Sequence, residues 1–170
     1  MKKGNIMDNN TCIYKEGKKI VPIIEDIIKN GGKCKLKVTG YSMTPTLKHL
    51  RDSVILTSPS SRPIEKGEIV FIQRTTGKYV LHRVYKIIDK DTFIMNGDAQ
   101  QWVEVVKNSQ VIGVCSSIIR NDKEISCDNW MYKFVIKIWQ FFMPIRKYIF
   151  KVNAILKTII KKMGNKERIF

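Results

Sequence analysis

Apolar and polar residues alternate in short runs over much of the first 120 residues. After Gly32, the residues Cys34, Leu36 and Val38 alternate with lysine and threonine, which is the period-two pattern of a half-buried strand. Similar runs predict strands at 54–57, 68–73, 79–88, 92–95 and 111–119. Because turn-forming residues and no helical pattern separate these runs, the sequence predicts a mainly β core of the barrel or sandwich kind.

Two segments outside this region have a helical period. Ile20 to Asn30 carries apolar residues on one helical face, and Gly31-Gly32 follows as a stop. From Trp130 to Met163, polar or exposed positions recur in steps of three and four, and the residues between them form a broad apolar face. Pro144 is expected to kink this helix or split it in two. The expected polar or exposed positions are Lys133, Lys137, Gln140, Pro144, Lys147, Lys151, Ala154, Thr158 and Lys161.

The length of 170 residues suits one domain with its own core and additions at its ends. We therefore predict an N-terminal arm at 1–19, a β domain at 20–128, a basic amphipathic helical tail at 129–163 and a C-terminal end at 164–170. The first residues lack the apolar stretch of a secretory signal, so no signal peptide is expected. No run of about 18 uncharged apolar residues predicts a spanning helix.

Basic residues outnumber acidic residues by 31 to 15, and the excess is uneven along the chain. Residues 1–128 carry a net charge of +7, whereas residues 129–170 hold ten basic residues and one acidic residue. Such an excess attracts either nucleic acid or an anionic lipid surface. Because the basic tail is also rich in aromatic and aliphatic residues, we expect residues 129–163 to bind an anionic membrane surface and expect no nucleic-acid partner. Core packing or an oligomer interface is the alternative use of this tail.

The four cysteines, Cys12, Cys34, Cys115 and Cys127, lie far apart in the sequence. They form no C-x-x-C pair and have no histidine at metal-ligand spacing. The sequence therefore predicts reduced thiols, and neither a metal nor another cofactor is implied.

The most specific motif in the chain is Gly40-Tyr41-Ser42-Met43-Thr44-Pro45-Thr46-Leu47, which directly follows a predicted strand. A serine at a strand end can point its hydroxyl into a cleft, and a preceding glycine permits close approach by a substrate backbone. The motif resembles the G-x-S-M-x-P-T-L box around the nucleophile of type I signal peptidases. This resemblance implies that Ser42 is a nucleophile.

A serine nucleophile needs a positioned base, and His82 is the candidate. The segment Tyr79-Val80-Leu81-His82-Arg83-Val84 resembles the family segment that carries a lysine base in bacterial signal peptidases. Histidine stands here in place of lysine, as in the endoplasmic-reticulum and archaeal-type branch. The other histidine, His49, lies in a predicted loop with no carboxylate motif and is the weaker candidate.

A histidine base works best with a carboxylate that holds its tautomer. The segment Asn96-Gly97-Asp98-Ala99 resembles the family's Gly-Asp box, which implies that Asp98 orients His82. The resemblance also implies that the Ser42 N–H meets the oxyanion, with Gly40 and Arg83 as support. Taken singly, Ser42, His82 and Asp98 could be a turn serine, a core histidine and a hairpin cap.

The resemblance covers roughly residues 33 to 119. Arg51-Asp52-Ser53-Val54 and Lys66-Gly67-Glu68-Ile69-Val70 are similar to the family's two Gly-Asp-x-Val segments, although the first lacks its glycine. The implied fold is the β-barrel-type core of the signal peptidase and LexA superfamily, followed by the amphipathic helical tail. The family's membrane anchor before the serine is not found in this sequence.

These observations predict a serine endopeptidase that cleaves signal or leader peptides through an acyl-enzyme. Its partner would be a peptide or preprotein substrate, and its expected location is the periphery of a bacterial membrane. Activity should fall below the His82 pKa, and a flat rate from pH 5 to pH 8 would count against His82 as the base. The alternatives are a cytosol-facing leader peptidase for small modified or exported peptides, a weaker case for a self-cleaving repressor, and a non-catalytic basic membrane-binding or nucleic-acid-binding module.

Overall fold

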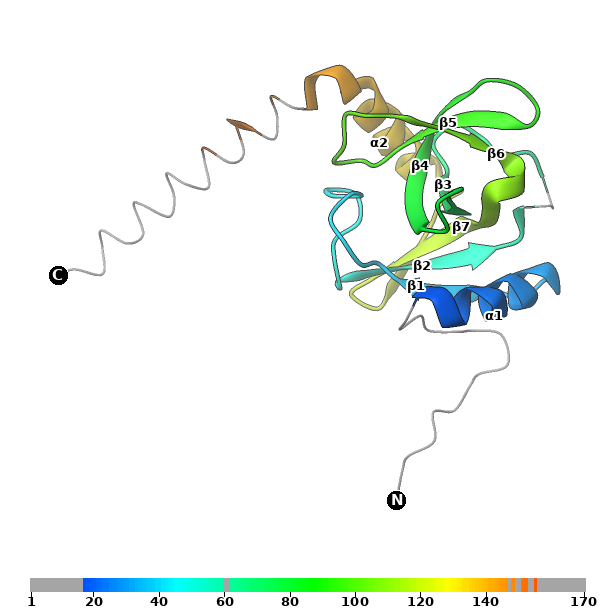
Figure 1. Ribbon diagram of the computed structural model, residues 1–170. Helices are drawn as coiled ribbons and strands as arrows, with labels where there is room; N and C mark the ends of the chain where they lie inside the picture. The colour runs from blue at the N-terminus through cyan, green and yellow to red at the C-terminus, as the bar shows by residue number, and fades with distance from the viewer. Residues whose placement is uncertain (1–16, 60–61, 147, 149–150, 153–154, 156–170) are drawn as a thin grey trace.

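Antiparallel strands form one curled sheet, which confirms the predicted mainly β core (Figure 1). The computed structural model describes residues 17–59, 62–146, 148, 151–152 and 155. Within this part of the chain the sheet has eight strands, with β8 paired to β7 beside the order β1-β2-β7-β3-β4-β5-β6. The strands are β1 Cys34–Lys37, β2 Asp52–Thr57, β3 Ile69–Gln73, β4 Tyr79–Ile87, β5 Thr92–Asn96, β6 Glu104–Lys107, β7 Val111–Arg120 and β8 Lys123–Ser126.

The long strand β7 joins the two halves of the sheet, because it pairs with β2, β3 and β8. Register shifts near Leu56 and Ile72 mark where the pairing with β2 and β3 is irregular, and such irregularities bend and twist a sheet. Apolar side chains form two buried clusters, one around Leu36, Leu56 and Ile118 and one around Val70, Val84 and Phe93. The curl of the sheet therefore encloses apolar residues on both of its faces.

Helix α1, Gly17–Lys29, confirms the predicted N-terminal helix and extends it toward the N-terminus. Its side chains Val21, Ile24 and Ile28 are buried, and the helix contacts β1 and β7. The helix stops where Gly31 has a φ of 79° and the Gly31 N–H bonds to the Ile28 carbonyl. A glycine in this left-handed conformation is a common helix end. The apolar face of α1 thus closes one side of the core.

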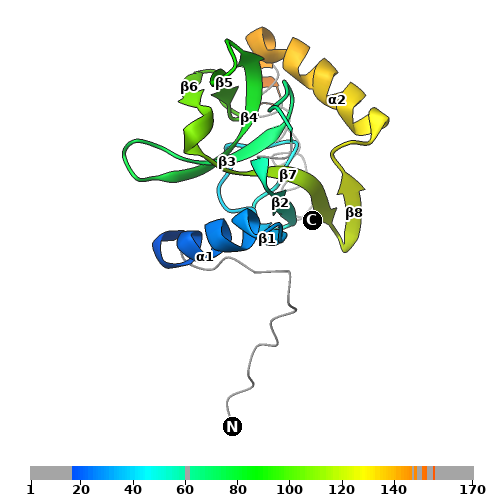
Figure 2. The same cartoon turned by 90° about the vertical axis from the view of Figure 1, so that its right-hand side faces the viewer.

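Helix α2, Trp130–Phe141, begins where the sequence predicts and is capped by the Asn129 side chain, which accepts from the Met131 and Tyr132 N–H groups. The short 3-10 helix η3, Met143–Ile145, follows and contains Pro144, which confirms the expected interruption. The views in Figures 1 and 2 place α1 and α2 at opposite ends of the sheet. In the part of the chain that the structure describes, no helix is long and apolar enough to cross a membrane.

The structure corrects several expectations from the sequence. Gln140, expected to be exposed, is buried, and its Nε2 donates to the Val84 carbonyl at 2.8 Å. Strands β6 and β8 are present although the sequence reasoning did not predict them. Cys34 is disulfide-bonded, so the expectation of reduced thiols is wrong there, whereas Cys115 and Cys127 are free. Of the predicted arm at 1–19, residues 17–19 belong to helix α1 and residues 1–16 lie outside the described residues, as do the end at 164–170 and much of 147–163.

Candidate active site

Ser42 lies in the loop between β1 and β2. Two apolar residues of the same motif, Met43 and Leu47, are buried. Gly40 has a φ of 90°, a conformation that L residues rarely adopt, so the motif needs glycine at the position where the chain leaves β1. Ser42 itself is half-buried. The apolar side chains anchor this loop to the core and leave the serine at its surface.

The loop is tied to the turn after β5 by a backbone hydrogen bond. The Ala99 N–H donates to the Ser42 carbonyl at 2.8 Å. A Cβ added at Gly97 would lie 2.8 Å from this same carbonyl oxygen, which is closer than real contacts allow. Gly97 is therefore needed for the loop that contains Ser42 and the turn after β5 to approach each other.

His82 lies on β4 and is only 2% exposed. The pairing of Arg83 with Asn96 on β5 places His82 opposite Gly97 in an antiparallel ladder. The Ser42 loop and the β4 segment with His82 therefore both lie next to the turn that contains Gly97. No hydrogen bond joins the two side chains in the described residues; in apo structures such catalytic hydrogen bonds are often long.

The surroundings of His82 keep its ring neutral. Burial, and after it the positive charge of Arg74, lowers the His82 pKa to about 4, although the charges of Glu104 and Asp98 oppose this change. The Nδ1 atom is buried and makes no hydrogen bond within the described residues. A neutral imidazole is the form that can accept a proton from a serine. Burial thus makes His82 available as a base throughout the neutral pH range.

Asp98 is placed in a different contact from the one that the sequence predicts. Its carboxylate is 1% exposed and bonds to the Arg83 guanidinium, with Nη2 at 2.8 Å and Nε at 3.0 Å, and to the Thr46 hydroxyl. It makes no hydrogen bond to His82 and acts on that ring only through its charge. In this arrangement Asp98 holds Thr46, and with it the nucleophile loop, against β4.

Arg83 has no N–H left for an oxyanion. Its Nη1 donates to the Gly67 carbonyl at 2.7 Å and to the Tyr132 hydroxyl at 3.3 Å, while Nε and Nη2 bond to Asp98 and Thr46. A guanidinium has five N–H donors, and these partners occupy them. Burial by itself lowers the pKa of Arg83, but the Asp98 carboxylate raises it overall, so the side chain stays charged. Arg83 therefore supports the site by holding Asp98.

The two backbone donors implied for the oxyanion differ in their partners. The Gly40 N–H already donates to His49 Nδ1 at 2.9 Å, and the His49 ring lies 4.9 Å from the Tyr41 ring. The Ser42 N–H makes no hydrogen bond within the described part of the chain. Of the two, Ser42 is the donor that the structure leaves available, and His49 supports the loop instead of serving as the base.

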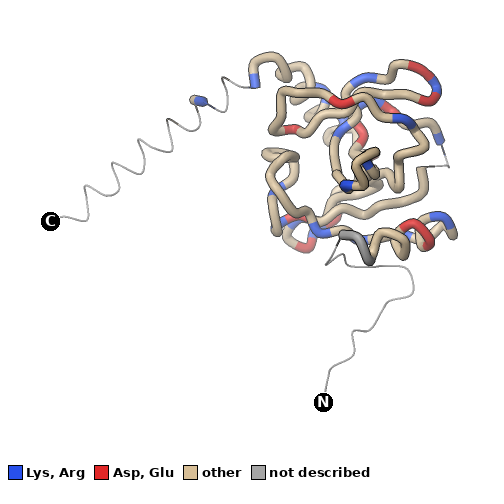
Figure 3. The backbone as a smooth tube through the Cα atoms, in the orientation of Figure 1, with Lys and Arg blue, Asp and Glu red and all other residues tan. Residues whose placement is uncertain are grey.

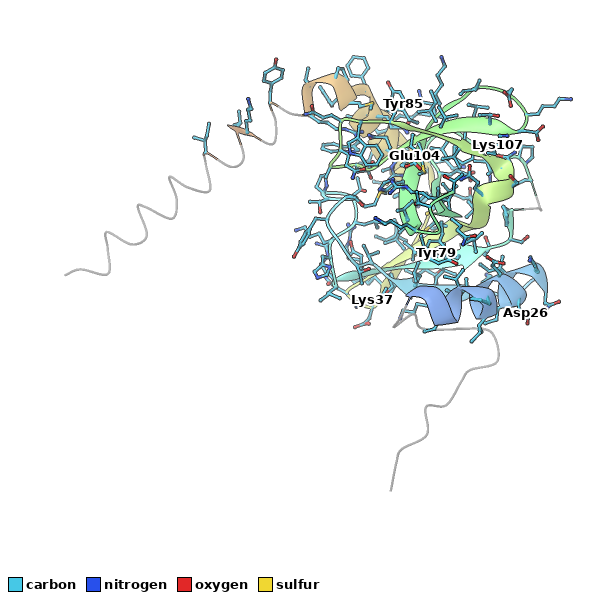
Figure 4. All side chains as sticks on the ribbon, in the orientation of Figure 1. Asp26, Lys37, Tyr79, Tyr85, Glu104 and Lys107 are labelled. Atoms are coloured by element: carbon cyan, nitrogen blue, oxygen red, sulfur yellow. The ribbon has the colours of Figure 1, made fainter. Side chains whose placement is uncertain are left out.

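Trp102, Arg74 and Glu104 form a cluster beside His82 that the sequence did not predict. The Trp102 ring lies 5.9 Å from the His82 ring, edge to face, and Arg74 lies 5.5 Å from the Trp102 centroid. Arg74 also forms a bidentate ion pair with Glu104, whose shorter contact is 2.7 Å. Figure 4 shows Glu104 in the central part of the molecule, above Tyr79 in that view. Only the pairing of β5 with the unpredicted strand β6 brings Glu104 to this position.

A cleft of about 180 Å³ opens beside Ser42. Its walls come from β1 and the loop after it, from Phe71 on β3, and from the residues just before His82 on β4. A larger cavity of about 680 Å³ lies between α2 and the β3–β4 region, and neither Ser42, His82 nor Asp98 lines it. The smaller cleft is thus the one that a substrate of Ser42 would enter.

The described chain is thus a curled antiparallel β core with a loop serine beside a cleft and a buried histidine on β4. The profile of the Peptidase S24-like family matches residues 8–115, which is more than half of the chain, and the chain belongs to this family. The matched range includes Ser42, His82 and Asp98 and ends on β7, before β8 and α2. No curated protein and no solved structure gives a significant match.

Proposed function

We propose that this chain is a serine endopeptidase in which Ser42 is the nucleophile and His82 the general base, and that it removes signal or leader peptides. The observation that carries the proposal is that the turn after β5 lies next to both the Ser42 loop and the β4 segment that contains His82. The Ser42 carbonyl accepts a hydrogen bond from the Ala99 N–H, in the turn that contains Gly97. Arg83 pairs with Asn96, so His82, the residue before Arg83, lies beside the start of the same turn. The family supports a peptidase, and the serine type is our inference from these residues.

In the proposed reaction, Ser42 Oγ bonds to the carbonyl carbon of the scissile peptide while its proton passes to His82. The Ser42 N–H donates to the oxyanion that forms, and one such donor contributes about 3 kcal/mol to transition-state stabilisation. The imidazolium then protonates the leaving amine as the C–N bond breaks, which leaves an ester on Ser42. Water deprotonated by neutral His82 hydrolyses this ester and restores the serine.

The edge strand β1 supports an extended peptide as the substrate. Among the described residues β1 pairs with β2 alone, which leaves its other edge unpaired within that part of the chain and open to a further strand. Leu36, Val38 and Gly40 line the cleft beside Ser42 at the end of this edge. A substrate strand paired with β1 would carry its scissile bond toward Ser42 and place a small side chain in the cleft of about 180 Å³.

The second candidate is a leader peptidase that faces the cytosol and trims small modified or exported peptides. It uses the same residues and reaction and differs only in its substrate. The absence of a spanning helix among the described residues is compatible with both candidates.

The test compares protein N-termini across the proteome of the native host, with its own copy removed and replaced by wild type, Ser42→Ala or the control Ser109→Ala. Ser109 is exposed and lies in the turn before β7, away from the cleft. We expect new N-termini with wild type and with Ser109→Ala but not with Ser42→Ala. The residues before these N-termini would separate secretory signals from small-peptide leaders. Identical N-termini in all strains would refute the peptidase and favour a non-catalytic binding module.

A further inference from the structure

Helix α2 has an inward face and an outward face of opposite exposure. Inward, Ile136 is 3% exposed and Gln140 bonds to β4 through the Val84 carbonyl. Outward, large apolar side chains of α2 and η3 are between 42% and 79% exposed. Six of them are Trp130, Phe134, Val135, Ile138, Phe141 and Ile145, here called the outward face.

The outward face is continuous around the helix. At about 100° per residue, the five members on α2 fall within an arc of about 140°, and Ile136 and Gln140 lie on the opposite side; Ile145 follows on η3. Exposed apolar patches of this kind mark interaction sites in soluble domains. The sheet covers the other side of α2, so no part of the described chain covers the outward face.

Lysines border the outward face, and one of them, Lys133, forms an ion pair with Asp128 just before the helix at 3.0 Å. Lys133 and Lys137 run along one border, and the sequence from Trp130 to Arg146 contains no acidic residue. Figure 3 shows this stretch with blue segments and no red segment. Residues 129–170 hold ten basic residues and one acidic residue in total. An apolar face with tryptophan and phenylalanine beside a lysine border is the composition of helices that lie in a bilayer interface.

Arg146 holds the end of this segment to the turn that carries Asp98. Its Nη1 donates to Asn96 Oδ1 at 3.0 Å and to the Asp98 carbonyl at 3.3 Å, and its Nη2 donates to the Trp139 carbonyl at 2.9 Å. The guanidinium also lies 4.7 Å from the centroid of the Trp139 ring, and it is 1% exposed. The outward face therefore has a set orientation relative to the candidate active site.

We propose that the outward face docks the protein on the surface of an anionic phospholipid bilayer, with α2 lying in the plane of the interface. The apolar side chains would enter the acyl boundary while Lys133 and Lys137 meet the lipid headgroups. A second copy of the chain fits this face less well, because Lys133 is already paired with Asp128 of its own chain and neither α2 helix has an acidic residue to pair with Lys137 of the other copy. The proposal does not depend on the proposed peptidase activity.

The experiment uses the full chain carrying Ser42→Ala, so that proteolysis does not affect the result. Binding to vesicles of phosphatidylcholine alone, and of phosphatidylcholine with phosphatidylglycerol, is measured by co-sedimentation at two salt concentrations. The test variant adds Phe134→Gln, Ile138→Gln and Phe141→Gln. The matched control adds Ile23→Gln, Ile88→Gln and Val105→Gln, which remove equally exposed apolar side chains from other surfaces. Circular dichroism and analytical ultracentrifugation establish the fold and oligomeric state of each protein.

We expect the parent chain and the control to bind anionic vesicles, more weakly at high salt, and the test variant to bind about 100-fold more weakly or not at all. Equal binding by the folded test variant would overturn the proposal. A parent chain that forms dimers broken by the test substitutions, without binding vesicles, would also overturn it and make the outward face a self-association surface. Equal affinity for neutral and anionic vesicles would refute the role given to the lysines.

Discussion

Asp98 lies in the turn after β5, and Glu104 is the first residue of β6. Their surroundings differ although they are only six residues apart. The Asp98 carboxylate and its partner Arg83 are 1% and 2% exposed, and the pair bonds further to Thr46, Gly67 and Tyr132. The Glu104 carboxylate and Arg74 are 25% and 23% exposed and sit against Trp102. The charge of Glu104 nevertheless acts on the His82 pKa more strongly than that of Asp98. The more deeply buried carboxylate is therefore not the one whose charge changes the His82 pKa more.

This comparison assigns different work to the two ion pairs. The buried pair has all its hydrogen bonds satisfied and joins the nucleophile loop, β4 and α2, so its removal should affect folding first. The partly exposed pair is screened by solvent and contributes little to stability, but it lies where its charges act on His82. The following predictions test this division.

The largest expected effect is on stability. Replacing Asp98 by alanine leaves the Arg83 guanidinium buried without its partner, so we expect the free energy of unfolding to fall by about 4 kcal/mol. Glu104→Ala is the matched control and should cost less than about 1 kcal/mol. Urea unfolding at pH 7 measures both variants. Similar losses for the two variants would contradict the division between the pairs.

The next effect is the dependence of activity on pH. Because the His82 pKa is about 4, its ring is neutral above that value, and kcat/KM should stay level from pH 8 to about pH 5. Below pH 4 the rate should fall about tenfold per pH unit as the ring becomes protonated. This prediction replaces the expectation from the sequence that a flat rate from pH 5 to pH 8 would count against His82 as the base. Circular dichroism at each pH serves as the control for acid unfolding, and a midpoint near pH 6.5 would refute the depressed pKa.

The sign of the same shift gives a stability test. Between pH 6.5 and pH 4 the unfolded chain takes up a proton on His82 that the folded chain does not, so the free energy of unfolding should decrease on acidification through this window. For a shift from 6.5 to about 4 the full difference is about 3 kcal/mol. The variant His82→Gln should lack this part of the slope. If wild type and His82→Gln have parallel stability profiles, the buried neutral histidine is refuted.

The smallest expected effect distinguishes the charges around the ring. Arg74 lowers the His82 pKa and Glu104 raises it, so Arg74→Gln should move the acid limb of kcat/KM to higher pH and Glu104→Gln to lower pH. Each displacement should be less than about one pH unit, because both side chains are partly solvated. The opposite signs are the readout, since a general loss of structure would not move the two variants in opposite directions. Displacements of the same sign would show that neither charge acts on His82 as described.

Local patterns were enough to predict much of the core and its family. The alternation at Cys34, Leu36 and Val38 and the apolar face of α1 report which side chains are buried, and both are visible along the chain. Strand β6 was not predicted, because in Glu104–Lys107 only Val106 is buried and the run is short. Without β6, nothing in the sequence placed Glu104 beside His82.

The two helices show where periodicity stops being informative. Both α1 and α2 have apolar residues at helical spacing, but α1 turns that face to the core, whereas α2 turns Ile136 and a buried glutamine inward and most of its large apolar side chains outward. A helical pattern states that a helix has two faces and does not state which one meets the sheet. Tertiary contacts fix which face of α2 meets the sheet, and the hydrogen bond from Gln140 to the Val84 carbonyl is one of them.

The sequence by itself determined the mainly β class, the start of α2 and the motifs that hold Ser42, His82 and Asp98, because these depend on neighbours along the chain. The tertiary structure decided that Asp98 pairs with Arg83, that the Gly40 N–H is taken by His49, and that His82 is buried enough for its pKa to fall to about 4. Ion pairing, donor availability and desolvation depend on groups that are distant in sequence and adjacent only after folding.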